Sequence, residues 1–532
     1  MLALPNAEDK SYHTMPEQET DEATPYIVDI PYSARYIPQQ SPSVLNFLTR
    51  LNGAKGRPVD QPYAYCDLGC GKGLTGNTLA AANPDSQFYG IDLNPEHIDY
   101  ANALANRAGL KNSHFLKGSF SDFSENDLPQ FDYITLHGVY SWVSPDVQAE
   151  VRNFLQMFLK PGGIVYVSYN TLPGWAPFLP IREIMKTFTE DMELGPLERA
   201  DEAVKILQML VEKKVPYTNA SSNVRKEIRR ISREGRRQLT HEFLNVYWQP
   251  RFFSEVAAEM ATIGLSFCCL AKLQLSSSKQ EILDQLSDFL SAQQSPETYE
   301  AAKSMVLNER FRRDIYVNAE RLLGFDAFEN LSPVVIGNAR VQRLHRKVKT
   351  SGMFAGATDV VNALYDGHHT LSELAALPEL KDYSRDDIFD AVCHLINKGT
   401  MRPFARPAYE LGAGAPPRGV RLSNQFNQVV LEENLSPGGT GDVRLASPVT
   451  GDGLEIDPAS RLLLLAVVDV GVEGAVARAF EILGESNIRF RVDGKRVTEP
   501  EAQRSALEDS FALFQDKFIP ALLRLGILEE AV

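Results

Sequence analysis

The stretch that most constrains this chain covers residues 63–92, where two short apolar segments enclose a glycine-rich turn and a helix-forming run. The first segment enters the run D-L-G-C-G-K-G at 67–73, and Thr75 to Ala82 follows as a predicted helix. The second segment, Gln87 to Ile91, ends at the carboxylate of Asp92. Glycines let the backbone approach a ligand closely, and a helix N-terminus directs amide groups toward it. The pattern therefore predicts a β-turn-α-β unit that binds a nucleotide-like cofactor.

The spacing of the glycines separates two classes of nucleotide-binding loop. The run at 67–73 does not follow the G-x-G-x-x-G spacing of NAD-binding loops, which disfavours NAD. It resembles motif I of the class I S-adenosylmethionine (SAM) methyltransferases, E/D-x-G-x-G-x-G. Asp92 lies 25 residues after Asp67, at the tip of the second strand, where a carboxylate can accept both ribose hydroxyls. A glycine-rich turn in an unrelated α/β domain is the alternative that the loop alone leaves open.

Composition and charge narrow the class of protein. A length of 532 residues corresponds to about two to four domains. The 54 Lys and Arg residues against 69 Asp and Glu give a net charge of -15, which disfavours nucleic acid as the main partner.

Targeting signals and cysteine usage give the expected location. The N-terminus is polar and acidic, and the longest apolar run, Leu462 to Val468, is far too short to span a bilayer. The five cysteines include no C-x-x-C pair, so the sequence predicts neither a metal site nor a redox motif. Their odd number fits a reducing compartment. We therefore expect a cytoplasmic protein without membrane insertion.

The predicted fold class is α/β. We expect a Rossmann-like, seven-stranded class I methyltransferase domain with a helical insertion, then a mainly helical middle domain and an α+β C-terminal domain. The predicted boundaries are 1–25 for a flexible tail, 26–275 for the methyltransferase domain with its insertion at 180–240, 276–406 for the middle domain, 407–419 for a linker and 420–532 for the C-terminal domain. In the middle domain, 308–323 is expected to be helical and 358–402 resembles a winged-helix module. Acidic residues around that module favour a protein contact or a structural role over DNA binding.

Two loops rich in aromatic residues are expected at the mouth of the site. H-G-V-Y-S-W-V at 137–143 follows the predicted strand 131–136, and Y-N-T-L-P-G-W at 169–175 follows the predicted strand 164–168. Ligands of open parallel sheets bind beyond the carboxyl ends of the strands, so both loops should lie beside the glycine-rich turn. Trp142 and Trp175 are two of the three tryptophans of the chain, and their position favours a substrate wall.

Candidate cofactor contacts come from the glycine-rich turn, the later strand ends and the segment before the first helix. Related folds often cover the methionine end of the cofactor with that segment, which makes Tyr36 and Gln40 candidates; packing on the sheet edge is the alternative. Ser119 stands where related folds often place an acid, and Phe120 is either a stacking partner for the adenine or plain core. The predicted set is Tyr36, Gln40, Asp67, Gly69, Cys70, Gly71, Asp92, Leu93, Ser119, Phe120, His137, Gly138 and Val139.

Four segments carry a more specific resemblance. H-G-V-Y-S-W-V, S-Y-N-T-L-P-G-W, H-E-F-L-N-V-Y-W and N-E-R-F-R-R-D-I-Y resemble a bacterial family of class I methyltransferases with a methyltransferase regulatory domain, which includes the rickettsial-type protein-lysine methyltransferases. The resemblance implies SAM as the donor, S-adenosylhomocysteine as the product and a protein lysine as one plausible acceptor. That protein would be an outer-membrane or surface protein before export. A homodimer is left open.

The expected chemistry is an in-line displacement in which the enzyme aligns and desolvates donor and nucleophile. A lysine acceptor must first lose a proton from a group that titrates near about 10.4 in water. An aromatic pocket lowers that value and holds the cation on its ring faces. The predicted catalytic set is Tyr140, Trp142, Tyr169 and Trp175 as the rings, Asn170 to orient the amine, and His137 as a base or as a cofactor-facing group.

Other functions remain open from the sequence. One is a small-molecule methyltransferase with the insertion as a lid, and another is a non-catalytic SAM-binding regulatory protein. The run at 224–237 contains six arginines and one lysine, which predicts either a solvated helix face with internal Glu partners or a docking surface for an acidic partner. That run is also the sole support for an RNA methyltransferase.

Overall fold

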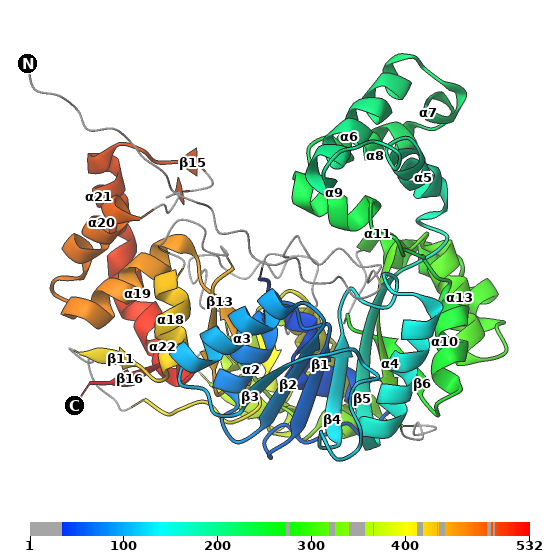
Figure 1. Cartoon of the computed structure of the whole chain (residues 1–532). Helices are drawn as coiled ribbons and strands as arrows, with labels where there is room; N and C mark the ends of the chain where they lie inside the picture. The colour runs from blue at the N-terminus through cyan, green and yellow to red at the C-terminus, as the bar shows by residue number, and fades with distance from the viewer. Residues whose placement is uncertain are drawn as a thin grey trace, which may run out of the picture.

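The computed structural model describes residues 34–532 apart from 273–276, 319–324, 340–356, 365–366, 412–418, 434, 436–441, 487–490, 493–494 and 532. Its centre is a seven-stranded sheet in the order β3-β2-β1-β4-β5-β7-β6 (Figure 1). The strands are β1 (Ala64–Leu68), β2 (Gln87–Asp92), β3 (Ser113–Lys117), β4 (Phe131–Leu136), β5 (Leu159–Asn170), β6 (Ser266–Leu270) and β7 (Phe311–Val317). This order confirms the class I methyltransferase fold expected from the sequence.

The register of the sheet sets where the site lies. Leu68 of β1 pairs with Ile91 of β2 and with Leu136 of β4, so three carboxyl ends are level. β5 continues beyond that level to Asn170, which pairs with Phe311 at the start of β7. β7 is antiparallel to both of its neighbours, so its first residues lie at the same edge of the sheet.

The expectation of a helix over 308–323 is wrong, because residues 311–317 form β7. Their side chains alternate with period two, as a strand between two others requires. Arg312 and Asp314 point to one face, where their charges are paired. Ile315 packs into the apolar core of the opposite face. β7 lies beyond residue 275, so the sheet takes a strand from the segment expected to be the middle domain.

Helices cover both faces of the sheet. On one face Tyr65, Tyr133 and Ile164 share a core with α1 and with the helices α14–α17 of residues 327–397. On the other face Cys66 and Ile134 share a core with α4 and α10. The helices of the first part of the chain are α1 (Pro42–Leu51), α2 (Leu74–Ala82), α3 (Pro95–Arg107), α4 (Pro145–Phe158) and α10 (Phe253–Ala261).

The segment after β5 is helical, as expected for 180–240, and it has its own apolar core. Figure 1 shows this insertion standing apart from the sheet on the side of β5 and β6. Arg310, just before β7, donates two hydrogen bonds of 3.0 Å to Glu227 of the insertion. The helices are α5 (Leu179–Thr187), α6 (Pro196–Glu212), α7 (Pro216–Ala220), α8 (Ser222–Ile231) and α9 (Arg236–Phe243).

The rest of the chain adds helices and small sheets. Its middle elements are α11 (Ser277–Gln285), α12 (Ser287–Ser291), α13 (Pro296–Val306), α14 (Ala327–Leu331), β8 (Val335–Asn338), α15 (Ala357–Ala363), β9 (His368–Thr370), α16 (Leu371–Ala375), α17 (Arg385–Asn397) and β10 (Met401–Pro403). Strands β8, β9 and β10 form one antiparallel sheet.

The last elements gather beside α3, at the β3 end of the sheet (Figure 1). They are β11 (Val420–Leu422), α18 (Gln425–Glu433), β12 (Arg444–Ser447), β13 (Asp452–Glu455), α19 (Pro458–Val470), α20 (Ala475–Glu485), β14 (Arg491–Val492), β15 (Lys495–Arg496), α21 (Pro500–Leu513), α22 (Ile519–Arg524) and β16 (Leu528–Glu530). The expected tail 1–25 and most of the expected linker 407–419 lie outside the described residues. The domain boundaries stay predictions.

The buried charges around β7 lead to a stability prediction. Arg312→Met removes the fully buried cation that is bonded to Asp314, Glu300 and Glu309. It should lower the free energy of unfolding by about 3–5 kcal/mol, because those carboxylates lose their partner. Urea and thermal denaturation measure the change. Arg504→Met is the control: its ion pair with Glu508 is solvent-exposed and should contribute little. Equal effects of the two substitutions would contradict a special role for the buried network.

Candidate active site

The glycine-rich turn closes over the ends of β1 and β2. Gly69 and Cys70 donate their backbone N–H groups to the carbonyl of Ile91, at 2.8 and 3.1 Å. Gly69 has a φ of +73°, and a Cβ there would lie 2.4 Å from Cγ2 of Val139 in the loop after β4. Gly71 has a φ of +53°, but nothing lies within 4 Å of the position of a Cβ. The turn therefore needs glycine for two reasons: close packing at 69 and open space for a ligand above 71.

The carboxylate of Asp92 lies against this turn. Its Oδ2 accepts a 2.8 Å hydrogen bond from the backbone N–H of Gly71. Its Oδ1 accepts one of 2.9 Å from the N–H of Asn94 and lies 3.2 Å from Nδ1 of His97. Leu93, which follows Asp92, is 42% exposed. A fixed acid beside an open glycine turn fits the ribose of an adenosyl cofactor, so this part of the chain can hold SAM.

A buried polar cluster lies under the turn. Nε2 of Gln40 donates to Oδ1 of Asp67 at 2.7 Å and to Oγ1 of Thr135 at 2.9 Å. Burial raises the pKa of Asp67 to about 7, although its hydrogen bonds with Thr135 and Gln40 favour the ionised form. Gln40 is thus part of the floor of the candidate cofactor site.

Tyr36 has a different surrounding from the one expected. Its hydroxyl is bonded to the carboxylate of Asp452 and accepts from the backbone N–H of Gly453 at 3.0 Å. Its own N–H donates to Asp442 at 3.0 Å. The ring is buried against the β12–β13 hairpin, so its phenol does not cover the cofactor position. The tie to residues more than 400 positions away could not be read from local sequence.

The loop after β3 is ordered by two acids. Oδ2 of Asp122 accepts the backbone N–H of Ser119 at 2.7 Å, and the hydroxyl of Ser119 donates to Glu150 at 2.8 Å. Phe120 packs, partly buried, against the core that α4 shares with the sheet. Sequence reasoning missed Glu150, which is distant in sequence and carries no local signal.

His137 lies in a polar cluster at the end of β4. Its Nδ1 is 2.8 Å from the hydroxyl of Tyr166 and 3.2 Å from Oγ of Ser168, which accepts the N–H of Gly138. Burial lowers the pKa of His137 to about 4, and the positive charge of Arg313 acts in the same direction. The imidazole is therefore neutral near pH 7, and its Nδ1 shares a hydrogen bond with the Tyr166 hydroxyl whose direction depends on the tautomer.

Tyr140 and Tyr169 do not line an open wall, which corrects the expectation for these two rings. The hydroxyl of Tyr140 donates to Glu259 at 2.5 Å, and the hydroxyl of Tyr169 donates to Asp314 at 2.6 Å. Both rings are fully buried in the core on the α4 and α10 face of the sheet. Tyr169 faces this core because side chains alternate along β5.

Trp142 and Trp175 both lie beside the ring of the third tryptophan of the chain, Trp248. The ring centroids of Trp248 and Trp175 are 5.0 Å apart, and those of Trp248 and Trp142 are 6.1 Å apart. Nε1 of Trp175 donates to Oδ1 of Asn170 at 3.2 Å. All three indoles are partly exposed. Sequence reasoning missed Trp248, although it ends the segment H-E-F-L-N-V-Y-W.

Two arginines lie over the tryptophan rings. Arg310 is 4.1 Å from the ring centroid of Trp175, and Arg182 is 5.5 Å from that of Trp248. Since Arg310 also binds Glu227 of α8, the aromatic cluster joins the insertion to the sheet. Hydrogen bonding to Arg310 and Arg230 holds the pKa of Glu227 below its usual value, against the effect of its burial.

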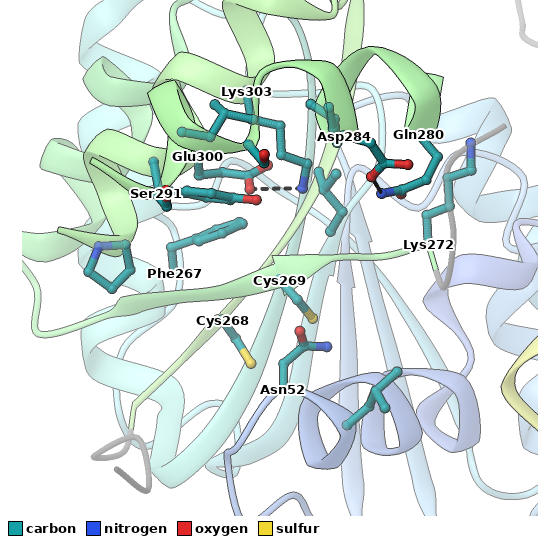
Figure 2. A pocket seen from close by; sticks show the side chains of 17 residues that line it. Asn52, Phe267, Cys268, Cys269, Lys272, Gln280, Asp284, Ser291, Glu300 and Lys303 are labelled. Carbon is teal, nitrogen blue, oxygen red and sulfur yellow. Dashed lines mark hydrogen bonds and ion pairs between the residues drawn. The ribbon is translucent and has the colours of Figure 1, made fainter. Parts of the chain in front are cut away.

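A pocket of about 630 Å³ lies away from this site, beside the edge strand β6 (Figure 2). It runs between the end of α1 and helices α11–α13. Two pairs of its polar side chains are hydrogen-bonded: Lys303 to Glu300, and Gln280 to Asp284. It contains none of the candidate cofactor residues.

The described ranges contain no group of three or more His, Cys, Asp or Glu side chains suited to a metal ion. None of their helices combines the length and the apolar character needed to cross a bilayer.

Comparisons with known proteins agree with this geometry. Residues 60–243 match a family described as a methyltransferase domain, and residues 235–318 match a predicted methyltransferase regulatory domain. An uncharacterized protein of Synechocystis sp. is 29% identical over 520 residues, which is 94% of this chain and 99% of the relative. An uncharacterized protein of Rickettsia prowazekii is 32% identical over 219 residues, which is 41% of this chain and 86% of the relative.

A solved structure shares the fold over nearly the whole chain. PKMT2 from Rickettsia typhi in complex with AdoHcy is similar with a TM-score of 0.70 and 20% identity. The similarity covers 93% of this chain and 100% of that one. The likeness therefore extends through the C-terminal elements.

The open space above Gly71 leads to a binding prediction. Gly71→Ala should weaken the binding of S-adenosylhomocysteine at least tenfold, because the new methyl group occupies the ligand's approach to the backbone. Gly162→Ala is a matched control: its φ is +72° and nothing lies within 4 Å, but it is in the amino-terminal part of β5. Isothermal titration compares the two. Equal losses of affinity would mean that backbone strain, not ligand contact, explains the effect.

The position of Asp92 leads to a second binding prediction. Asp92→Asn should weaken the same ligand by at least tenfold, because a carboxamide cannot accept two ribose hydroxyls while it holds Gly71. Asp99→Asn, at an exposed position of α3, should change the affinity much less. Undiminished affinity in Asp92→Asn would remove the acid from the cofactor site.

Proposed function

Because the chain belongs to the class I SAM-dependent methyltransferases that carry a methyltransferase regulatory domain, we propose that it methylates lysine side chains of a protein. The observation that carries the proposal is the cluster of Trp142, Trp175 and Trp248 beside Asn170. Indole rings attract alkylammonium groups and exclude water, and an amide oxygen can orient an amine. The name PKMT2 of the Rickettsia typhi neighbour gives the same acceptor class for that protein.

The chain's own residues would divide the work between donor and acceptor. When bound, SAM supplies an electrophilic methyl group on a positively charged sulfur. The backbone at Gly69 and Gly71 and the carboxylate of Asp92 would hold its adenosyl part. His137 is neutral near pH 7 and its Nδ1 hydrogen-bonds Tyr166, so its lowered pKa makes it a weak base for an acceptor amine. This favours a cofactor-facing or positioning role for His137 over the role of general base.

A protein acceptor also fits the surface of the insertion. Within 224–237, Arg230 is paired with Glu227 and Glu234, and Arg236 is paired with Asp201. These contacts support the solvated-face prediction for part of the run. Four exposed side chains have no ion pair among the described residues: Lys226, Arg229, Arg233 and Arg237. They would dock an acidic segment near the acceptor lysine, while the acidic charge of the whole chain disfavours RNA.

A protein-lysine acceptor also implies where the reaction would take place. The acceptor would be methylated in the cytoplasm, before export if it is a surface protein. The units 26–275 and 276–406 would act together, because β7 belongs to the sheet and carries Arg310 to the insertion.

The direct test uses tritiated SAM with a lysate of the source cell, split into protein, nucleic acid and metabolite fractions. Label should appear in protein and, after hydrolysis, in methylated lysine identified by mass spectrometry. Label confined to the metabolite fraction would indicate a small-molecule enzyme, and label in RNA would indicate an RNA methyltransferase. Either result would overturn the proposal.

The tryptophan cluster leads to a kinetic prediction. Trp175→Ala should lower turnover on the protein fraction at least tenfold, because the indole orders Asn170 and shields the amine from water. The affinity for S-adenosylhomocysteine should not change. Trp175→Phe should keep more activity than Trp175→Ala, and Phe289→Ala, a 53% exposed ring on α12, should keep all of it. Full activity of Trp175→Ala would show that the acceptor binds elsewhere.

A further inference from the structure

Arg313, one of the two arginines of β7, has no acidic partner among the residues that the structure describes. Arg313 of β7 pairs in register with Ser168 of β5, and strand alternation puts its side chain on the face of Phe311 and Ile315. Its guanidinium lies 4.9 Å from the ring centroid of Phe311. The ring of Phe311 in turn lies 5.9 Å from that of His137, edge to face. Arg313, Phe311 and His137 therefore surround one place at the carboxyl edge of β4 and β5.

The neighbours of Arg313 show what is unusual about it. Arg310 binds Glu227, and Arg312 binds three carboxylates, so both of these charges are compensated. For Arg313, no ion pair occurs within the ranges that the structure covers. Its Nε is buried and has no hydrogen-bond partner there. A positive charge that no acid neutralises shifts the pKa of any ionisable group that a ligand places beside it.

The other ionisable groups around this place do not cancel the charge. His137 of β4 is neutral, because burial and the charge of Arg313 both lower its pKa. Burial raises the pKa of Tyr166 of β5, so its phenol is also neutral. The carboxylate of Asp67 of β1 is directed to Gln40 and Thr135. A cation that already disfavours protonation of one base will disfavour it for a second base beside it.

A methyl acceptor must be a neutral amine. Lysine titrates near about 10.4 in water, so on the order of one molecule in a thousand is neutral near pH 7.4. A nearby positive charge lowers the pKa of the amine by roughly 1–3 units, and each unit raises the fraction of neutral amine about tenfold. No side-chain base is then needed.

We propose that Arg313 is a positioning residue for the reaction whose charge keeps the acceptor amine unprotonated and nucleophilic. The ammonium first releases its proton to water. The nitrogen lone pair then forms the bond to the methyl carbon while the carbon–sulfur bond breaks and its electron pair stays on sulfur. The product ammonium releases a second proton to water. This inference rests on the proposed lysine acceptor.

The test is the pH profile of methyl transfer to the protein fraction of the lysate, as an initial rate at subsaturating protein. The rate falls at low pH because the amine is protonated there. Arg313→Gln removes the like charge and raises the pH at which the amine loses its proton. The acidic limb should therefore move to higher pH by about 1 unit, so that the rate near pH 7 falls about tenfold and recovers at alkaline pH.

Two variants and a binding measurement separate this role from a structural one. Arg313→Lys keeps the charge and should keep the limb near its original position. Arg385→Gln removes an exposed arginine of α17 and should change nothing. S-adenosylhomocysteine should bind all variants with unchanged affinity, which also shows that they are folded.

Three outcomes would overturn the inference. The first is an Arg313→Gln rate that is lowered equally at all pH values, and the second is a raised KM with an unmoved limb, which would indicate that Arg313 binds a carboxylate of the acceptor. The third is a limb that moves equally in Arg313→Lys. If the parent enzyme labels no protein at all, the proposed function itself fails, which is a distinguishable result.

Discussion

The buried guanidinium of Arg312 holds the strand on which the rest of the site depends. It is fully buried, contacts the carboxylates of Asp314, Glu300 and Glu309, and lies over the ring of Phe253. Charges that leave water need such complete pairing, so this network favours one position for β7 between β5 and β6. β7 then brings one arginine to the helical insertion and another to the mouth of the site. The same strand thus connects the sheet, α13 and the insertion.

The two halves of the site differ in charge. The β1 and β2 side presents the open backbone at Gly71 and the carboxylate of Asp92, which suit an adenosyl group. The β5 and β7 side presents indole rings with arginines over them. Under the proposed function, the acidic side would favour the positively charged methyl donor, and the charge of Arg313 would favour a neutral amine over an ammonium beside it. The reaction would then need no side-chain base.

The C-terminal elements contact α2 and the segment before α1, which both border the cofactor half of the site. The β12–β13 hairpin packs on α2, the helix that follows the glycine-rich turn, and Asn83 donates to the carbonyl of Gly451 at 3.0 Å. The same hairpin binds the hydroxyl of Tyr36, and the N–H of Ile37 donates to Thr75 of α2 at 3.1 Å. The segment that ends at Gln40 is therefore held between α2 and the end of the chain. This gives a structural reason why the likeness to PKMT2 continues to the C-terminus.

The sequence by itself determined the cofactor half. The turn at 67–73 and Asp92 form a unit whose contacts lie within about 30 residues, so local pattern and glycine spacing suffice to predict it, and the α/β class I fold follows. Only the tertiary structure decided how the aromatic side chains and residues 311–317 are arranged on the other side of the site. Tyr140 and Tyr169 belong to the core, Trp248 completes the aromatic cluster, and 311–317 is a strand. The direction of each of these side chains depends on register with partners far away in the chain, and a shift of one residue would turn every side chain of a strand to the other face.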